Sequence, residues 1–132
     1  MTSFEGDTGP YLQYAHTRLL SIRRKLTLSE PELSALETAD WSLLREAHAI
    51  ELVRTLAQWP DVVLDTVKKL EPATVLTYLF KMTHVLNSSY EHLNVIGSEP
   101  KLQQARMALY ESARQVLHNG MTLLGLSPVD RM

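Results

Sequence analysis

Cysteine is absent from this sequence of 132 residues. A disulfide framework, a zinc site built on thiolates and a catalytic thiol are therefore excluded. No run of residues approaches the roughly 20 apolar side chains needed to cross a bilayer. The first residues carry neither the basic nor the apolar region of a signal peptide. We expect a soluble, cytoplasmic protein with no membrane partner, and a mitochondrial location stays open.

An excess of charge of one sign is also absent, because the formal net charge is −2. The chain as a whole therefore has no field of the kind that attracts nucleic acid. Arg18, Arg23, Arg24 and Lys25 nevertheless fall close together. A patch of this size is as typical of a solvated helix end as of a binding surface. With 45% hydrophobic and 21% charged residues, the composition indicates one folded domain.

Patterns that carry catalysis or bind metals are missing as well. The five histidines show no HExxH or other close ligand spacing, so we expect no metal site. The sequence contains neither a nucleophile elbow nor a glycine-rich phosphate loop. We therefore expect this chain alone to be catalytically inactive.

Apolar residues recur at helical spacing, and no stretch alternates long enough to compete as a strand. The sequence therefore predicts an all-α fold, a single helical bundle of about five main helices. The first helix is expected to begin near Pro10, with Thr8 as its cap, and to end near Arg24. Residues 26–40 read as a polar connection with one short helical turn.

Four further helices are bounded by a capping residue, a proline or a glycine. Asp40 can cap the second helix, and the pair Trp59 and Pro60 ends it. Pro72 opens the fourth helix, and Gly125 is a natural stop for the last. We expect these helices at about residues 40–58, 61–69, 72–95 and 101–124.

Distinctive passages lie at both ends of the chain and in its middle. Residues 4–18 (FEGDTGPYLQYAHTR) resemble the point in arginyl-tRNA synthetases where the catalytic domain gives way to the anticodon-binding helices. Residues 105–110 and 119–132 look like the end of the same family, and residues 72–80 (PATVLTYLF) are similar to eukaryotic, particularly fungal-type, members. The literal four-letter signature that names the family's DALR domain is absent, and its nearest match is Ala108 followed by Leu109.

The resemblance implies that residues 1–132 are the C-terminal anticodon-binding domain of a class I arginyl-tRNA synthetase, with residues 1–9 as the junction from a missing catalytic domain. The domain would receive the anticodon loop of arginine tRNA within a monomeric arginine-tRNA ligase. The family's HIGH-type nucleotide signature and its lysine-containing catalytic loop are absent here. We therefore expect no cofactor in this chain and ATP only in the missing catalytic domain of the parent enzyme.

Tyr11, Tyr14 and Arg18 stand at i, i+3 and i+7, within about 60° on one face of the first helix. From spacing alone, the tyrosines are as consistent with packing at the rim of the core. By resemblance, these positions meet the anticodon loop, with the tyrosines stacking on bases and Arg18 donating to a phosphate or base edge. The neighbouring apolar stripe consists of Leu12, Ala15, Leu19 and Ile22, and we expect Leu12, Ala15 and Leu19 to be buried.

Three more tRNA-binding candidates follow from the resemblance. Tyr90 matches a tyrosine near the end of the family's fourth helix, and a half-buried packing role is the alternative. Asn94 stands where we expect relatives to have tryptophan, so a hydrogen-bonding side chain replaces a stacking one. Met132 matches a last residue that folds back towards the anticodon site. Residues that can anchor this tail are Leu124, Leu126, Pro128 and Val129.

Two other functions stay open at this point. One is a helical protein–protein interaction module, whose tyrosines would meet a partner protein. The other is the anticodon domain of a different class I synthetase. Binding of RNA at two salt concentrations distinguishes the first, because phosphate contacts make affinity fall with salt. A comparison of arginine tRNA with cysteine tRNA distinguishes the second.

Overall fold

The computed structural model describes residues 2–27 and 29–130, and over these residues it contains helices and no strand. The all-α prediction is therefore confirmed, with five helices of eleven or more residues and one short helix. The elements are, in order, α1 (Thr2–Leu26), α2 (Glu30–Ala35), the 3-10 turns η1 (Leu36–Thr38) and η2 (Trp41–Leu43), α3 (Ala47–Ala57), α4 (Trp59–Lys69), α5 (Pro72–Ser89) and α6 (Pro100–Leu123).

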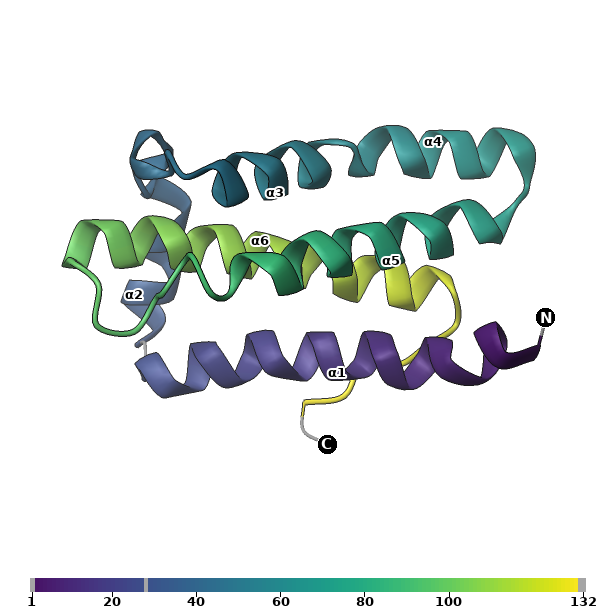
Figure 1. Ribbon diagram of the computed structural model, residues 1–132, viewed down its shortest axis with the longest axis horizontal. Coiled ribbons are helices and arrows are strands. Elements are labelled where there is room, and N and C mark those ends of the chain that lie inside the picture. Colours follow the sequence, from purple (N-terminus) through teal and green to yellow (C-terminus); the bar gives the residue numbers. More distant parts are fainter. Residues whose placement is uncertain (1, 28, 131–132) are drawn as a thin grey trace.

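The helices form an elongated bundle with its long helices nearly parallel to one axis (Figure 1). α3 and α4 follow one another along one edge, and α1 runs along the opposite edge. α5 and α6 lie between them, so that α5 contacts α3 and α4 while α6 contacts α1. The short helix α2 crosses the end of the bundle where α1 finishes.

The core is built mainly on α5 and α6, whose apolar residues have the predicted helical spacing. Leu79 of α5 and Leu109 and Tyr110 of α6 are fully buried. Each such side chain contributes on the order of 1.5 to 3 kcal/mol by leaving water. Gly120 lets α6 approach α5 closely, because a Cβ at that position would lie 2.7 Å from a methyl carbon of Leu79.

The predicted start of the first helix is wrong. α1 begins at Thr2 instead of near Pro10, so the proline lies inside the helix. A proline inside a helix removes one backbone hydrogen bond and leaves one carbonyl oxygen without its partner. Pro10 is exposed, so water can reach that part of the backbone. In a sequence, proline indicates the first turn of a helix. In this structure Pro10 lies within α1, on the side of the helix that faces solvent.

The predicted end of the fourth helix is also wrong, because α5 ends at Ser89 and not near Val95. The Ser89 hydroxyl lies 2.9 Å from that of Tyr110, and the amide of Leu93 donates to the Ser89 carbonyl oxygen at 2.9 Å. The chain then turns so that Leu93 and Val95 are both buried. Burial of these two side chains in the core therefore decides where the helix stops.

The second predicted helix is divided. Asp40 does act as a cap, since its carboxylate accepts from the Ser42 amide at 3.0 Å, but it caps only η2. α3 begins later, at Ala47, after a bend that buries Leu44. The predicted end is confirmed, since α3 ends at Ala57, and the pair Trp59 and Pro60 lies in the first turn of α4, where proline is tolerated. The polar connection was expected to contain one short helical turn. It contains the six-residue helix α2, which Ser29 caps.

The segment after α6 returns along α1, which places the C-terminal end beside that helix (Figure 1). The Gln13 amide holds it from both sides, donating to Ser127 O at 2.7 Å and accepting from Val129 N at 2.9 Å. Leu124 and Leu126 pack against the core as predicted. The anchor therefore combines apolar packing with backbone hydrogen bonds to one side chain.

Candidate nucleic-acid interface

One face of α1 is polar and aromatic, and the adjacent stripe is buried. Leu12, Ala15 and Leu19 are almost fully enclosed, which confirms that part of the prediction. Tyr11 is 37% exposed, Tyr14 is 62% exposed, and Arg18 is exposed. The angular separation read from the sequence thus corresponds to a real boundary between core and surface.

The two tyrosines of α1 have different surroundings. The Tyr11 ring stacks on Phe80 of α5, with ring centroids 5.3 Å apart and planes at 30°. One face of this ring is therefore covered by the protein. Tyr14 has more open surface than Tyr11 and no ring contact with the described residues. Tyr14 is consequently the more accessible of the two for a base that stacks on it.

Arg18, Tyr90 and Tyr110 form a layered arrangement between α1, α5 and α6. The guanidinium carbon of Arg18 lies 3.8 Å from the Tyr90 ring centroid, in a cation–π contact. The Tyr90 ring stacks in turn on Tyr110 at 5.4 Å. The hydroxyl of Tyr110 is held by Ser89, so the base of the stack is rigid. The stack fixes the guanidinium plane beside an open surface.

These residues border a cavity of about 260 Å³ at the junction of α1, the end of α5 and the following loop. The cavity brings together three of the predicted site residues, Arg18, Tyr90 and Asn94. Tyr11 and Tyr14 lie outside its lining, further towards the start of α1. Other lining residues were not predicted as site residues: Ser21, Ile22, Lys25, Leu93, Val95, Ile96 and Tyr110.

Two of the missed residues, Ser21 and Lys25, continue the face of Arg18. They stand at i+3 and i+7 from it, so helical spacing alone carried the signal. In the sequence, Lys25 stands out only as part of the basic patch. Its position adds a second positive charge to the cavity beside Arg18. The site therefore extends one helical turn or more beyond the residues chosen from the resemblance.

The hydroxyl of Tyr90 is buried and has no hydrogen-bond partner among the described residues. Burial raises the pKa of Tyr90, and the nearby charge of Arg18 acts in the opposite direction. The phenol is consequently neutral at physiological pH and offers its ring, not a charge, to the cavity. Tyr90 is half-buried, as the alternative interpretation of the sequence expected, and it also lines the cavity.

The loop that carries Asn94 is fixed by its backbone. The Asn94 carbonyl oxygen accepts from the guanidinium of Arg106 at 2.7 Å and from the Ser98 hydroxyl. Arg106 is itself paired with Glu46 at 2.8 Å. The Asn94 side chain is exposed and has no hydrogen bond to the described residues, so it can meet the polar edge of a base. Met132 lies outside the described residues, so its predicted role stays a prediction.

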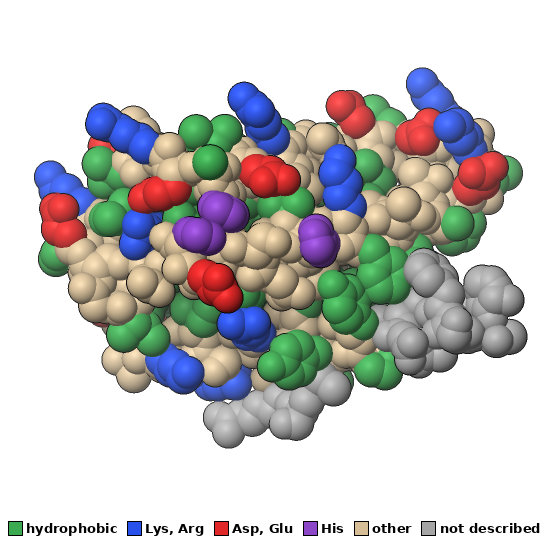
Figure 2. Space-filling model, in the orientation of Figure 1, with side chains coloured by type: hydrophobic (Ala, Val, Ile, Leu, Met, Phe, Trp, Pro, Cys, Tyr) green, Lys and Arg blue, Asp and Glu red, His purple; other side chains and the backbone are tan. Residues whose placement is uncertain are grey.

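Charges of both signs are mixed on the face shown in Figure 2, where Lys and Arg side chains are interspersed with Asp and Glu. The net charge of the whole chain is −2. Binding of RNA would therefore depend on individual contacts more than on a long-range field.

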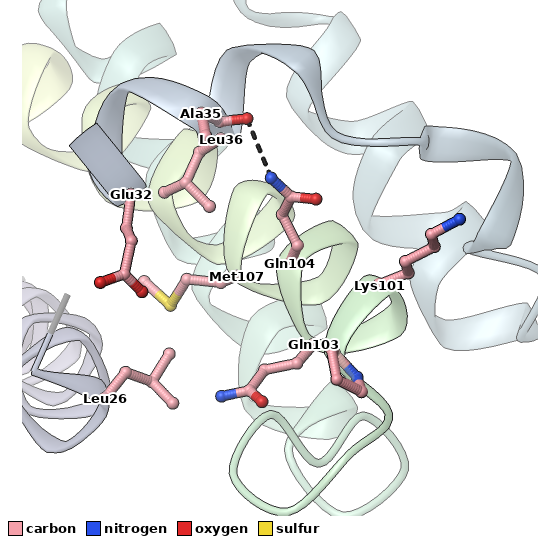
Figure 3. A pocket seen from close by; sticks show the side chains of 9 residues that line it. Leu26, Glu32, Ala35, Leu36, Lys101, Gln103, Gln104 and Met107 are labelled. Atoms are coloured by element: carbon pink, nitrogen blue, oxygen red, sulfur yellow. Dashed lines mark hydrogen bonds between the residues drawn. The ribbon is translucent and has the colours of Figure 1, made fainter. Parts of the chain in front are cut away.

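A second cavity, of about 360 Å³, lies between the end of α1, α2 and the start of α6 (Figure 3). Leu26, Leu36 and Met107 converge in it, and the Gln104 side chain donates to the Ala35 carbonyl oxygen at 3.1 Å. Lys101 points away from these apolar side chains. None of the described residues that line this cavity is aromatic, so they lack the stacking surface of the Tyr90 cavity.

Within the described ranges, no cluster of three or more His, Cys, Asp or Glu side chains is arranged to hold a metal ion. His48 and His92 stack face to face with centroids 3.8 Å apart. Over residues 2–27 and 29–130, no helix is long and apolar enough to span a bilayer.

The fold and this surface define a helical-bundle domain with an aromatic, arginine-bearing cavity at one side. Residues 12–132 match the DALR anticodon binding domain, and the chain belongs to that family. The family assignment confirms the resemblance found in the sequence, although the four letters of the signature are absent.

Known proteins similar to the chain are arginine–tRNA ligases. The chain is 55% identical over all 132 residues to the cytoplasmic arginine–tRNA ligase of Saccharomyces cerevisiae, and 52% identical to the mitochondrial one of the same organism. It covers 21% and 20% of these proteins, about one fifth of their length. The solved Thermus thermophilus arginyl-tRNA synthetase superposes with a TM-score of 0.80 at 29% identity, over 98% of this chain and 22% of that one.

Proposed function

We propose that this chain binds the anticodon arm of arginine tRNA as part of an arginyl-tRNA synthetase, and so supports selection of the tRNA for ATP-dependent arginylation. The observation that carries this proposal is the stack of Arg18 on Tyr90 at a cavity that Asn94 also borders. An anticodon base turned out of its loop requires a π surface, a cation and a hydrogen-bonding edge. All three lie together here.

Each tyrosine has a distinct place in this proposal. Tyr14, with most of its surface open, stacks on one base, while Tyr11, supported by Phe80, stacks on another through its free face. Stacking contributes about 1 to 3 kcal/mol per base. Because Arg18 and Lys25 are the only cations of the cavity lining among the described residues, phosphate contacts are few and binding is weak and salt-sensitive. We expect a preference for cytosine at the middle anticodon position.

The use of ATP and arginine belongs, in this proposal, to the remaining part of a longer, monomeric protein. The chain spans about a fifth of its curated relatives, and its own described residues supply the RNA-binding surface. We place this protein in the cytoplasm, and one similar relative is mitochondrial.

Nucleotide footprinting of an arginine tRNA with this chain tests the proposal. Protection limited to the anticodon loop is expected, and it should weaken when salt is raised. A cysteine tRNA at the same concentrations serves as the control and should be less protected. Protection confined to the acceptor end, or equal protection of both tRNAs, would contradict the proposed specificity.

The protein-interaction alternative has a different observation in its favour. Leu64, Val67 and Leu70 are apolar and exposed on or beside α4, on the edge of the bundle opposite α1. They do not adjoin the predicted site residues of α1, so a protein contact there is compatible with RNA binding on the other edge. Salt-insensitive binding to a protein that is lost when Leu64 or Val67 is replaced by a polar residue, with no RNA binding by the chain, would favour this alternative.

A further inference from the structure

A third cavity lies on the other side of α1 from Tyr14, between α1, α6 and the segment after α6. Its volume is about 520 Å³. Cationic and ionisable side chains make up most of its lining, whereas the Tyr90 cavity is aromatic. The lining residues are His16, Leu20, Arg23, Arg24, Arg114, His118, Pro128 and Asp130.

Charge is unbalanced around this cavity. Among the described residues, the two carboxylates near it are those of Glu111 and Asp130. Glu111 pairs with Arg23 at 3.4 Å and with Arg114 at 2.8 Å. Arg24 has no ion pair with the described residues and donates only to the Asp130 carbonyl oxygen, at 3.2 Å. Among these described residues, three guanidinium groups face two carboxylates, so their net charge is positive even when both histidines are neutral.

His16 supplies the second observation. The residue is 2% exposed, and its Nδ1 lies 3.2 Å from the Val129 carbonyl oxygen. A carbonyl oxygen only accepts, so Nδ1 carries the proton and donates. Nε2 is buried and has no hydrogen-bond partner among the described residues. His16 lines the cavity, and an unpartnered buried nitrogen costs free energy that an occupant reaching Nε2 with a hydrogen-bonding group would remove.

We propose that this cavity is a binding site for a phosphate group, in which Arg24, Arg114 and His118 attract the anion and His16 becomes protonated at Nε2 to donate to it. Guanidinium groups suit the geometry and charge of phosphate oxygens. Pro128 and Asp130 line the same cavity, so an occupant also ties the C-terminal segment to α1. The phosphate comes from a free phosphate compound or from an RNA backbone, and the site does not depend on the proposed recognition of anticodon bases.

Proton uptake on binding follows from the groups that face His16. Burial lowers the pKa of this imidazole, and the charges of Arg114 and His118 act in the same direction, while Asp130 acts in the opposite one. Arg23 and Arg24 on α1 add positive charge, and Glu111 on α6 offsets part of it. A bound anion neutralises these cations and accepts from Nε2, so it favours protonated His16. Affinity for the anion should then increase as pH falls.

Sulfate is a suitable probe, because it has the shape of phosphate and does not itself titrate near neutral pH. Imidazole nitrogen resonances of His16 and His118 are followed in the full chain by NMR, with sulfate exchanged for chloride at constant ionic strength. We expect a saturable shift of the His16 Nε2 resonance, and an affinity that rises roughly tenfold when pH is lowered by about two units. A shift that never saturates, or one without pH dependence, overturns the proposal.

Arg24→Gln is the test variant, because Arg24 is exposed and its loss leaves the Arg114–Glu111 pair intact. Sulfate affinity should fall about tenfold, the effect of removing one charged donor. Arg54→Gln is the matched control, since Arg54 is exposed on α3 and does not line the cavity. Equal weakening in both variants would show only a loss of net charge and would overturn the site.

The source of the phosphate is assigned by adding a single-stranded RNA with the sequence of the arginine anticodon loop. If the RNA displaces sulfate from His16, the backbone of that RNA occupies the site. If sulfate still binds with unchanged affinity to the RNA-bound protein, a free phosphate compound is the ligand. RNA that fails to bind at all contradicts the proposed function and leaves the sulfate result as an independent test of this cavity.

Discussion

The guanidinium of Arg18 lies over the ring of Tyr90, with its central carbon 3.8 Å from the ring centroid. The contact joins the middle of α1 to the end of α5, two segments far apart in the sequence. It holds the cation over the ring beside the cavity that both residues line. The same contact couples the orientation of the arginine to the packing of the tyrosine on Tyr110.

Replacement of this arginine should weaken RNA binding without unfolding the protein. For Arg18→Gln we expect a loss of RNA affinity of about tenfold, since one charged donor disappears. Filter binding of the anticodon-loop RNA measures it. Arg54→Gln removes an exposed arginine from the opposite edge and serves as the control. Equal losses in the two variants would mean that only net charge matters.

The hydroxyl of Tyr90 should be dispensable, unlike its ring. Tyr90→Phe removes a buried hydroxyl without a described partner, so the free energy of unfolding should stay the same or rise by about 1 kcal/mol. RNA affinity should be unchanged, because the π face remains. Urea denaturation and RNA binding measure the two quantities. A marked loss of affinity would show that the hydroxyl itself contacts RNA.

The two tyrosines of α1 should separate binding from stability. Tyr14→Ala should cost about 1 to 3 kcal/mol of RNA binding and change the free energy of unfolding by less than about 0.5 kcal/mol. Tyr11→Ala should also destabilise the fold, by about 1 to 2 kcal/mol, because the ring packs on Phe80. In a complete synthetase, both should impair aminoacylation of tRNA and spare arginine adenylation. Equal impairment of both reactions would indicate a folding defect.

Glycine substitutions should have different effects at two helical positions. A Cβ at Gly120 would press on the fully buried Leu79, so Gly120→Ala should lower the free energy of unfolding by about 1 to 3 kcal/mol. Gly9 lies in α1 directly before Pro10, and apart from its chain neighbours and the backbone of the helix no described atom lies within 4 Å of a Cβ there. The gain in helix propensity is offset by the clash of the proline ring with a preceding Cβ, so Gly9→Ala should change the free energy of unfolding by less than about 0.5 kcal/mol. Urea denaturation of both variants checks the pair. Stabilisation by Gly120→Ala would show that α5 and α6 are less tightly packed than described.

The C-terminal segment should detach when the Gln13 amide is altered. Gln13→Glu replaces the donor to Ser127 O with an oxygen, which places two acceptors together. Hydrogen exchange at the Val129 amide should become faster, because its partner at 2.9 Å is disturbed. Gln103→Glu, on α6 and away from this segment, should leave that exchange unchanged. Unaltered exchange in Gln13→Glu would contradict the anchoring role.

His16 should make stability depend on pH. Its folded-state pKa is lowered by burial, so the unfolded chain binds the proton more readily. The free energy of unfolding should therefore fall as pH drops below the ordinary histidine value of about 6.5. Denaturant unfolding without sulfate or phosphate, at pH values above and below that point, measures the slope. His16→Asn should flatten it, and an unchanged slope in this variant would assign the effect to other groups.

The sequence by itself determined the class of fold and the orientation of the first helix. Leu12, Ala15 and Leu19 are buried beside the exposed Tyr14, as their spacing predicted, because helical periodicity is a local property of the chain. The family could also be identified, since its long passages are carried by consecutive residues. Boundaries were less predictable: Pro10 has the character of a start signal, although its exposure lets α1 continue through it.

The tertiary structure alone decided which distant residues share a site. Arg18, Tyr90 and Asn94 meet because the end of α5 packs against α1, and no local spacing encodes that contact. α5 stops at Ser89 because burial of the following loop outweighs helical propensity. The basic cavity around His16 likewise exists only because the C-terminal segment returns to α1. Contacts of this kind depend on the free energy of packing the whole chain, which a one-dimensional pattern does not contain.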